Sequence, residues 1–65
     1  MRIQLNGAWR DTQAAQLAAA LAEFGYGEAI VATSVNGEFV AVAAREATAL
    51  TEGDRVEVLA PMQGG

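Results

Sequence analysis

Cysteine, histidine and lysine are all absent from this chain of 65 residues. Without cysteine there is no disulfide, no thiolate nucleophile and no thiolate metal site. Without histidine and lysine, the chain lacks the commonest general base and the amine that forms Schiff bases or accepts isopeptide bonds. Carboxylates remain, but they are scattered. The composition argues against an enzyme, and we expect no catalytic residue, no metal site and no cofactor bound by the chain itself.

Positive charge is also scarce. Four arginines stand against eight acidic residues, which gives a formal charge of −4. With no basic stripe, nucleic acid is not expected as a partner. The acidic balance suits either plain solubility or a protein partner with a basic surface. No apolar run approaches the roughly 20 residues of a membrane span, and "MRIQLNG" is too short and too alternating for a signal peptide. We expect a cytoplasmic protein with no membrane partner.

The first part of the chain predicts a β-hairpin. Residues 1–5 alternate apolar and polar side chains, as in a half-buried strand. Asn6-Gly7 follows directly, and this pair favours a type I′ turn because that turn needs positive φ at both central positions. Residues 8–10 ("AWR") should therefore return as a short second strand.

A helical pattern follows, opened by Asp11-Thr12, either of which could cap the first turn. Apolar residues then recur at spacings of three and four, as on one face of a helix. They are Ala14, Leu17, Ala18, Leu21 and Phe24. Gly25 stands where a left-handed C-terminal cap is expected. The pattern predicts one core helix.

The rest of the chain reads mainly as strands. "AIVATSV" (29–35) and "EFVAV" (38–42) flank a second Asn-Gly pair and predict another hairpin. "AAREATA" (43–49) has room for one helical turn, Leu50 reads as a core anchor, and "EGD" (52–54) as a turn. "RVEVLA" (55–60) is the last predicted strand.

The predicted order is β-β-α-β-β-β, the pattern of a β-grasp (ubiquitin-like) domain in the α+β class. We expect a mixed sheet of about five strands, covered on one face by one helix. Ferredoxins share this architecture but need cysteines for their cluster. The domain should span residues 1–60, and residues 61–65 should form a flexible C-terminal Gly-Gly tail.

Several short stretches resemble the ThiS family, the thiamine-biosynthesis sulfur carrier proteins. They are "LNG", "LAEFG", "VNGEFV", "LTEGDRVEVL" and the terminal Gly-Gly. None is specific alone, but together they occur in this order in a chain of this length. The small subunit of molybdopterin synthase has the same fold and tail but is usually longer.

The resemblance implies a specific chemistry at the tail. An E1-like enzyme, ThiF, would use ATP and Mg²⁺ to adenylate the carboxylate of Gly65. A persulfide relay would supply the sulfur that converts the adenylate to a thiocarboxylate, and the thiazole synthase ThiG would accept that sulfur. The tail residues Pro61, Met62, Gln63 and Gly64 would enter the partner's active site.

The residues of the tail suit this chemistry. A free α-carboxylate has a pKa near 3.5 and is ionised at neutral pH, but it is a poor acyl electrophile until it is adenylated. Gly64 and Gly65 have no Cβ, so the acyl carbon can enter a narrow site. The six residues beyond Leu59 reach at most roughly 20 Å when extended.

Strand alternation predicts a docking surface at the base of the tail. In the last strand Val56 and Val58 should face the core, which leaves Leu59 on the open face of the sheet. A two-residue Asn-Gly loop pairs Ser34 with Phe39, so Phe39 should lie on the same open face. We predict that Leu59 and Phe39 form an exposed apolar patch for the activating enzyme.

Three other functions stay open. The chain could carry sulfur for molybdopterin synthesis, it could be a ubiquitin-like modifier conjugated to lysines of target proteins, or it could be a free-standing enzyme or ligand-binding domain. The product separates a carrier from a modifier: a thiocarboxylate indicates a carrier, whereas an isopeptide adduct indicates a modifier. A free-standing enzyme or ligand-binding domain should keep full activity without the tail.

Overall fold

The computed structural model describes residues 1–60. It contains five strands, one α-helix and one 3₁₀-helix. In chain order these are β1 (Arg2–Leu5), β2 (Ala8–Asp11), α1 (Leu17–Glu23), β3 (Ala32–Val35), β4 (Glu38–Val40), η1 (Val42–Ala47) and β5 (Arg55–Leu59).

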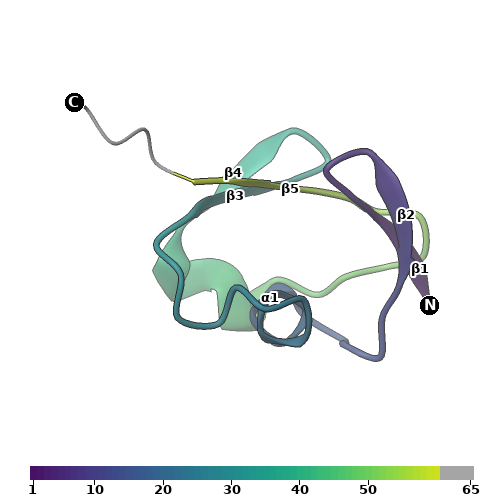
Figure 1. The fold of residues 1–65 in the computed structure, drawn as a ribbon, viewed down its shortest axis with the longest axis horizontal. Helices are drawn as coiled ribbons and strands as arrows, with labels where there is room; N and C mark the ends of the chain where they lie inside the picture. The colour runs from purple at the N-terminus through teal and green to yellow at the C-terminus, as the bar shows by residue number, and fades with distance from the viewer. Residues whose placement is uncertain (61–65) are drawn as a thin grey trace.

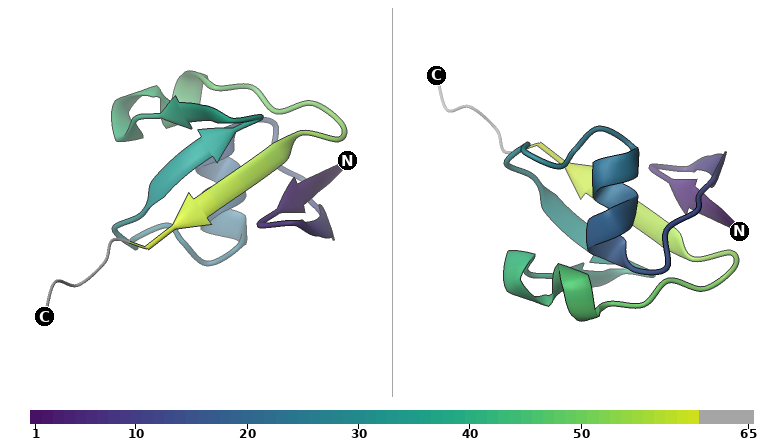
Figure 2. Two further views of the ribbon diagram at one scale, coloured as in Figure 1. Left: turned by 90° about the horizontal axis from the view of Figure 1, so that it is seen from above. Right: turned by 90° about the horizontal axis from the view of Figure 1, so that it is seen from below.

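The five strands form one mixed sheet in the order β2-β1-β5-β3-β4. The last strand is central: β5 runs parallel to β1 and antiparallel to β3. Helix α1 lies against one face of the sheet and leaves the other face open (Figures 1 and 2). The predicted β-grasp architecture is confirmed.

The core lies between α1 and the sheet. Its buried apolar residues are Ile3, Leu5, Ala14, Leu17, Ala20, Leu21, Val40, Leu50, Val56 and Val58. The predicted anchors Leu50, Val56 and Val58 are among them. Fully burying one such aliphatic side chain is worth roughly 1.5–3 kcal/mol, so this small set supplies much of the driving force for folding.

Both predicted hairpin turns are confirmed. Asn6 and Asn36 have φ of 50° and 51°, and the glycines that follow them have φ of 84° and 86°. These are the positive angles of a type I′ turn. The second turn sets the register of its hairpin, with Val35 opposite Glu38.

The predicted start of the helix is wrong. Asp11 belongs to β2, where it pairs with Arg2, and the helix begins only at Leu17. The capping residue is Gln16, whose side chain accepts a hydrogen bond from the Ala19 backbone N–H at 3.2 Å. Thr12 is buried instead, and its Oγ1 donates to Glu23 Oε1 at 2.7 Å. Pairing with β1 holds this segment in the hairpin, so the local capping signal is overridden.

The helical stripe is partly confirmed. Leu17 and Leu21 are buried, and Phe24 packs at the edge of the core. Ala14 is also buried but precedes the helix, whereas Ala18 is only half-buried; Ala20, which the stripe omitted, is buried instead.

The helix ends as predicted. Gly25 has φ of 92°, and its N–H donates to the carbonyl of Ala22 at 3.2 Å. The N–H of Tyr26 donates to the carbonyl of Leu21 at 2.7 Å. This is the Schellman arrangement, which satisfies carbonyls that the last turn would leave free.

Strands β3 and β4 are shorter than predicted. The third strand starts at Ala32 rather than at residue 29, and Ala32 lies opposite Leu59, the last residue of β5. Ile30, outside this pairing, is 84% exposed. Strand β4 stops at Val40, and Val42 begins η1, the expected helical turn.

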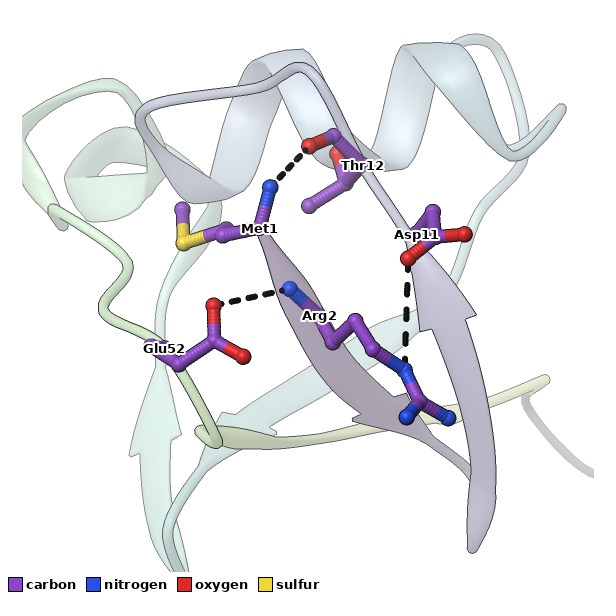
Figure 3. Close-up of polar contacts among 5 residues, drawn as sticks. All are labelled: Met1, Arg2, Asp11, Thr12 and Glu52. Atoms are coloured by element: carbon purple, nitrogen blue, oxygen red, sulfur yellow. Dashed lines mark hydrogen bonds and ion pairs between the residues drawn. The ribbon is translucent and has the colours of Figure 1, made fainter.

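The start of β1 is tied to two other segments, as Figure 3 shows. The Met1 amine donates to the Thr12 carbonyl at 3.0 Å, and the Arg2 N–H donates to Glu52 Oε1 at 3.0 Å. The Arg2 guanidinium lies 3.9 Å from an Asp11 carboxylate oxygen across the hairpin. The predicted turn at residues 52–54 thus joins the base of β1.

Between residues 1 and 60, no helix has the length and apolar character needed to cross a bilayer.

Candidate docking site at the end of strand β5

The open face of the sheet carries the predicted apolar pair. Leu59 is 70% exposed and Phe39 is 73% exposed, while their strand neighbours Val58 and Val40 are buried. The predicted orientation of both side chains is confirmed. We call Leu59 and Phe39 together the apolar patch.

Strand register brings the two side chains to one groove. Ser34 lies opposite both Phe39 and Glu57, and Ala32 lies opposite Leu59. Between them is a cavity of about 200 Å³ that Phe39, Leu59 and Asn6 help to line. Glu57 Oε1 accepts a hydrogen bond from the Ser34 hydroxyl at 3.3 Å within this surface. The groove is therefore apolar at the two exposed side chains and polar between them.

The end of β5 is held by a turn residue. Asn6 Oδ1 accepts from the Val58 N–H at 2.8 Å, and Asn6 Nδ2 donates to the Val58 carbonyl at 3.3 Å. The backbone hydrogen bonds between β1 and β5 begin at Gln4 and end at Asn6, whose N–H donates to the Val56 carbonyl. The amide of Asn6 thus extends the ladder by one step and positions the residue before Leu59.

The start of β5 is held in the same way by the other turn. Asn36 Oδ1 accepts from the Arg55 N–H at 2.9 Å, and Asn36 Nδ2 donates to Asp54 Oδ1 at 2.9 Å. Asp54 also accepts hydrogen bonds from the Thr51 N–H and hydroxyl. Partial burial raises the pKa of Asp54, but the hydrogen bonds from Thr51 and Asn36 outweigh it, and the pKa lies below its ordinary value.

Sequence reasoning missed these side-chain roles. The two asparagines were interpreted only through their backbone angles, because their partners Val58 and Arg55 lie far away in sequence. Trp9 was also missed: it is 50% exposed on the open face, with the Arg2 guanidinium 5.0 Å from its ring centre. Alternation through the first hairpin could have found it, since Trp9 lies opposite the polar Gln4.

The predicted tail sites lie outside the described residues. They are Pro61, Met62, Gln63, Gly64 and Gly65. Strand β5 ends at Leu59, so the chain leaves the sheet beside the apolar patch.

Comparisons with known proteins agree with this fold. A crystal structure of a thiamine biosynthesis protein (ThiS) from Geobacter metallireducens is 32% identical, with a TM-score of 0.80 over the full length of both chains. A solution NMR structure of a thiamine biosynthesis protein from the same organism is 29% identical, with a TM-score of 0.77 over 100% of this chain and 88% of that one. No match was found among curated proteins. The family model of the ThiS family matches residues 3–65. The chain therefore belongs to the ThiS family.

Proposed function

We propose that this protein is a sulfur carrier that holds sulfur as a thiocarboxylate at Gly65 and donates it to thiazole formation in thiamine biosynthesis. The observation that carries the proposal is the family match, which runs through both terminal glycines. Similarity to a thiamine biosynthesis protein along the whole chain supports the pathway. The protein acts here as a cosubstrate, which is consumed and regenerated, rather than as a catalyst.

The chemistry begins with activation of the carboxylate. An oxygen of the Gly65 carboxylate attacks the α-phosphate of ATP, and pyrophosphate leaves. An E1-like enzyme of the ThiF type would supply this site, where Mg²⁺ would neutralise the phosphate charge. The carboxylate is ionised at neutral pH, so it is ready as a nucleophile. The product is an acyl-adenylate whose leaving group is AMP.

Sulfur then replaces the adenylate. A persulfide sulfur of the donor attacks the acyl carbon, AMP leaves, and a further thiol cleaves the sulfur–sulfur bond to release the thiocarboxylate. Since the 65 residues include no cysteine, the persulfide and the thiol both belong to partner proteins. A thiazole synthase of the ThiG type would accept the sulfur, and an oxygen atom from its substrate or from water would take the place of the sulfur on the acyl carbon to restore the carboxylate.

The apolar patch would hold the activating enzyme while the tail enters its active site. Leu59 is the last residue of β5, and the six residues that follow it span at most roughly 20 Å when extended. A partner docked on Leu59 and Phe39 therefore has its nucleotide within that distance of the patch. The tail residues Pro61, Met62, Gln63 and Gly64 would fill the channel between the two.

Mass spectrometry of the intact protein tests the proposal. After incubation with an E1-like enzyme, ATP and a persulfide donor, the mass should rise by the difference between one sulfur and one oxygen atom. Fragmentation should place the change on Gly65. An isopeptide adduct on a lysine of another protein would instead identify a modifier, and sulfur on any other residue would contradict the proposal. Transfer from the loaded protein to molybdopterin synthesis, but not to thiazole, would reassign the pathway.

A further inference from the structure

A second groove lies beside strand β4, and Phe39 of the apolar patch is one of the residues that line it. Its volume is about 700 Å³, and it is open to solvent. Val35 and Val40 line it from the second hairpin, and Ala44 and Ala49 line it from the segment that follows β4. Figure 2 shows this segment, residues 41–54, passing along the β4 side of the molecule. The small alanine side chains leave room for side chains of a bound peptide.

The strand beside this groove has free backbone groups. Strand β4 is at the edge of the sheet and pairs only with β3. The two-residue turn makes Val35 and Glu38 a hydrogen-bonded pair, and Thr33 and Val40 form the next such pair. Phe39 lies between these pairs on β4. Its backbone N–H and carbonyl therefore point away from β3, toward the open edge of the sheet. Within residues 1–60, neither group has a hydrogen-bond partner. An exposed edge of this kind is a template for an added strand.

The opposite wall of the groove is held rigidly. The Thr48 hydroxyl donates to the Ala44 carbonyl at 2.8 Å, and the Leu50 N–H donates to the Ala15 carbonyl at 3.0 Å. Arg45 joins η1 to β3 through a hydrogen bond to the Val31 carbonyl at 2.7 Å. A groove whose walls are already ordered loses little conformational entropy when a ligand binds.

The charge of the groove is negative. Its ionisable side chains are the carboxylates of Glu38 and Asp54, and none of the four arginines lines it. The Asp54 oxygens accept hydrogen bonds from Thr51 and Asn36, whereas Glu38 has no side-chain hydrogen bond or ion pair within residues 1–60. Glu38 is therefore available to a cation, and complementary charge favours a basic ligand.

We propose that this groove binds an extended basic segment of a partner protein, which pairs with the Phe39 backbone as an added strand and places a lysine or arginine beside Glu38. Alternate side chains of the segment point into the groove between Val40 and Ala44, so small apolar residues should alternate with basic ones. This surface is separate from the tail, and the proposal does not depend on sulfur transfer.

The probe is a synthetic peptide of alternating arginine and valine, five residues long, with blocked ends. Titration into the full-length ¹⁵N-labelled protein should shift the amide signals of Phe39, Val40, Ala44 and Ala49, and should slow hydrogen exchange at Phe39. A second peptide, N-methylated at its three central residues, keeps the side chains but cannot pair as a strand, and it should not bind. Equal binding of the two peptides, or shifts centred on Leu59, would overturn the proposal.

Matched charge variants test the electrostatic part. Glu38→Lys should weaken peptide binding roughly threefold or more, since one exposed ion pair is lost and a repulsion is gained. Glu28→Lys makes the same change of net charge at an exposed loop position outside the groove and should have a clearly smaller effect. Equal weakening by both variants would mean nonspecific attraction and would sink the idea. Phe39 shifts that grow with protein concentration in the absence of peptide would assign the edge to self-association instead.

Discussion

The side-chain amide of Asn6 bonds both backbone groups of Val58, the residue before the exposed Leu59. A turn residue near the start of the chain thus holds the end of the central strand. Val58 is buried, so its backbone groups would otherwise have few partners. The contact therefore adds to the pairing with β3 in holding the end of the strand that carries Leu59.

Asn6→Gly should therefore destabilise the protein through β5. Glycine adopts the positive φ of the turn without strain. The decrease in the free energy of unfolding therefore comes mainly from the two lost hydrogen bonds, which are worth about 1–3 kcal/mol together. Chemical denaturation measures the free energy of unfolding, and hydrogen exchange measures protection of the Val58 amide. Asn6→Asp keeps the acceptor and loses the donor. Its free energy of unfolding should therefore lie between those of Asn6→Gly and the wild type. Unchanged Val58 protection in Asn6→Gly would contradict the assignment.

Leu59→Asp should weaken binding to the activating enzyme with little loss of thermal stability. Burying a side chain of this size at an interface is worth roughly 1.5–3 kcal/mol, which is about 10- to 150-fold in affinity. Calorimetric titration gives the affinity. Val42→Asp is the matched control, because Val42 is equally exposed at 72% but lies on η1, away from the patch. Equal affinities for Leu59→Asp and wild type would remove Leu59 from the interface.

Gly64→Val should leave the fold unchanged and slow the activation of the carboxylate. The expectation rests on the narrow path that an adenylating site allows to the acyl carbon, which a branched side chain next to Gly65 would obstruct. ATP–pyrophosphate exchange measures the step directly. Gln63→Ala, which adds no bulk to the tail, should be less affected. An exchange rate for Gly64→Val equal to that of the wild type would count against the proposed threading.

Asp54 should contribute a pH-dependent part of the stability. Its folded pKa is lowered, so the contribution is fully present above the ordinary pKa of about 3.9 and is lost as the pH falls through the folded value. The stability difference between wild type and Asp54→Asn should therefore be constant near neutral pH and shrink in acid. Urea unfolding of both proteins across this range checks the sign; a difference that grows toward acid would refute it.

Local signals in the sequence predicted which segments form strands and turns, but not where each strand ends. The Asn-Gly pairs and the alternation of Val56 and Val58 predict the hairpins, the register and the exposure of Leu59 and Phe39, because each depends on a period of two or on one turn. The start of the helix could not be found this way. Its position depends on Asp11 pairing with Arg2, a contact between strands that outweighs the local cap.

The parts of the site that were missed involve contacts distant in sequence. Asn6 and Val58 are 52 positions apart, and no short pattern joins them. The same holds for the groove beside β4, since Val40 and Ala49 meet there only after η1 turns the chain back.

The place of β5 in the sheet has a consequence for how the chain folds. The two hairpins do not pair with each other, because β5 stands between β1 and β3. Each hairpin can form early from local contacts, but the sheet closes only when the last strand inserts between them, at the entropic cost of joining distant segments. Folding and insertion of β5 should therefore be one cooperative event. A cut within β5 would therefore leave the two hairpins without the strand that joins them into one sheet.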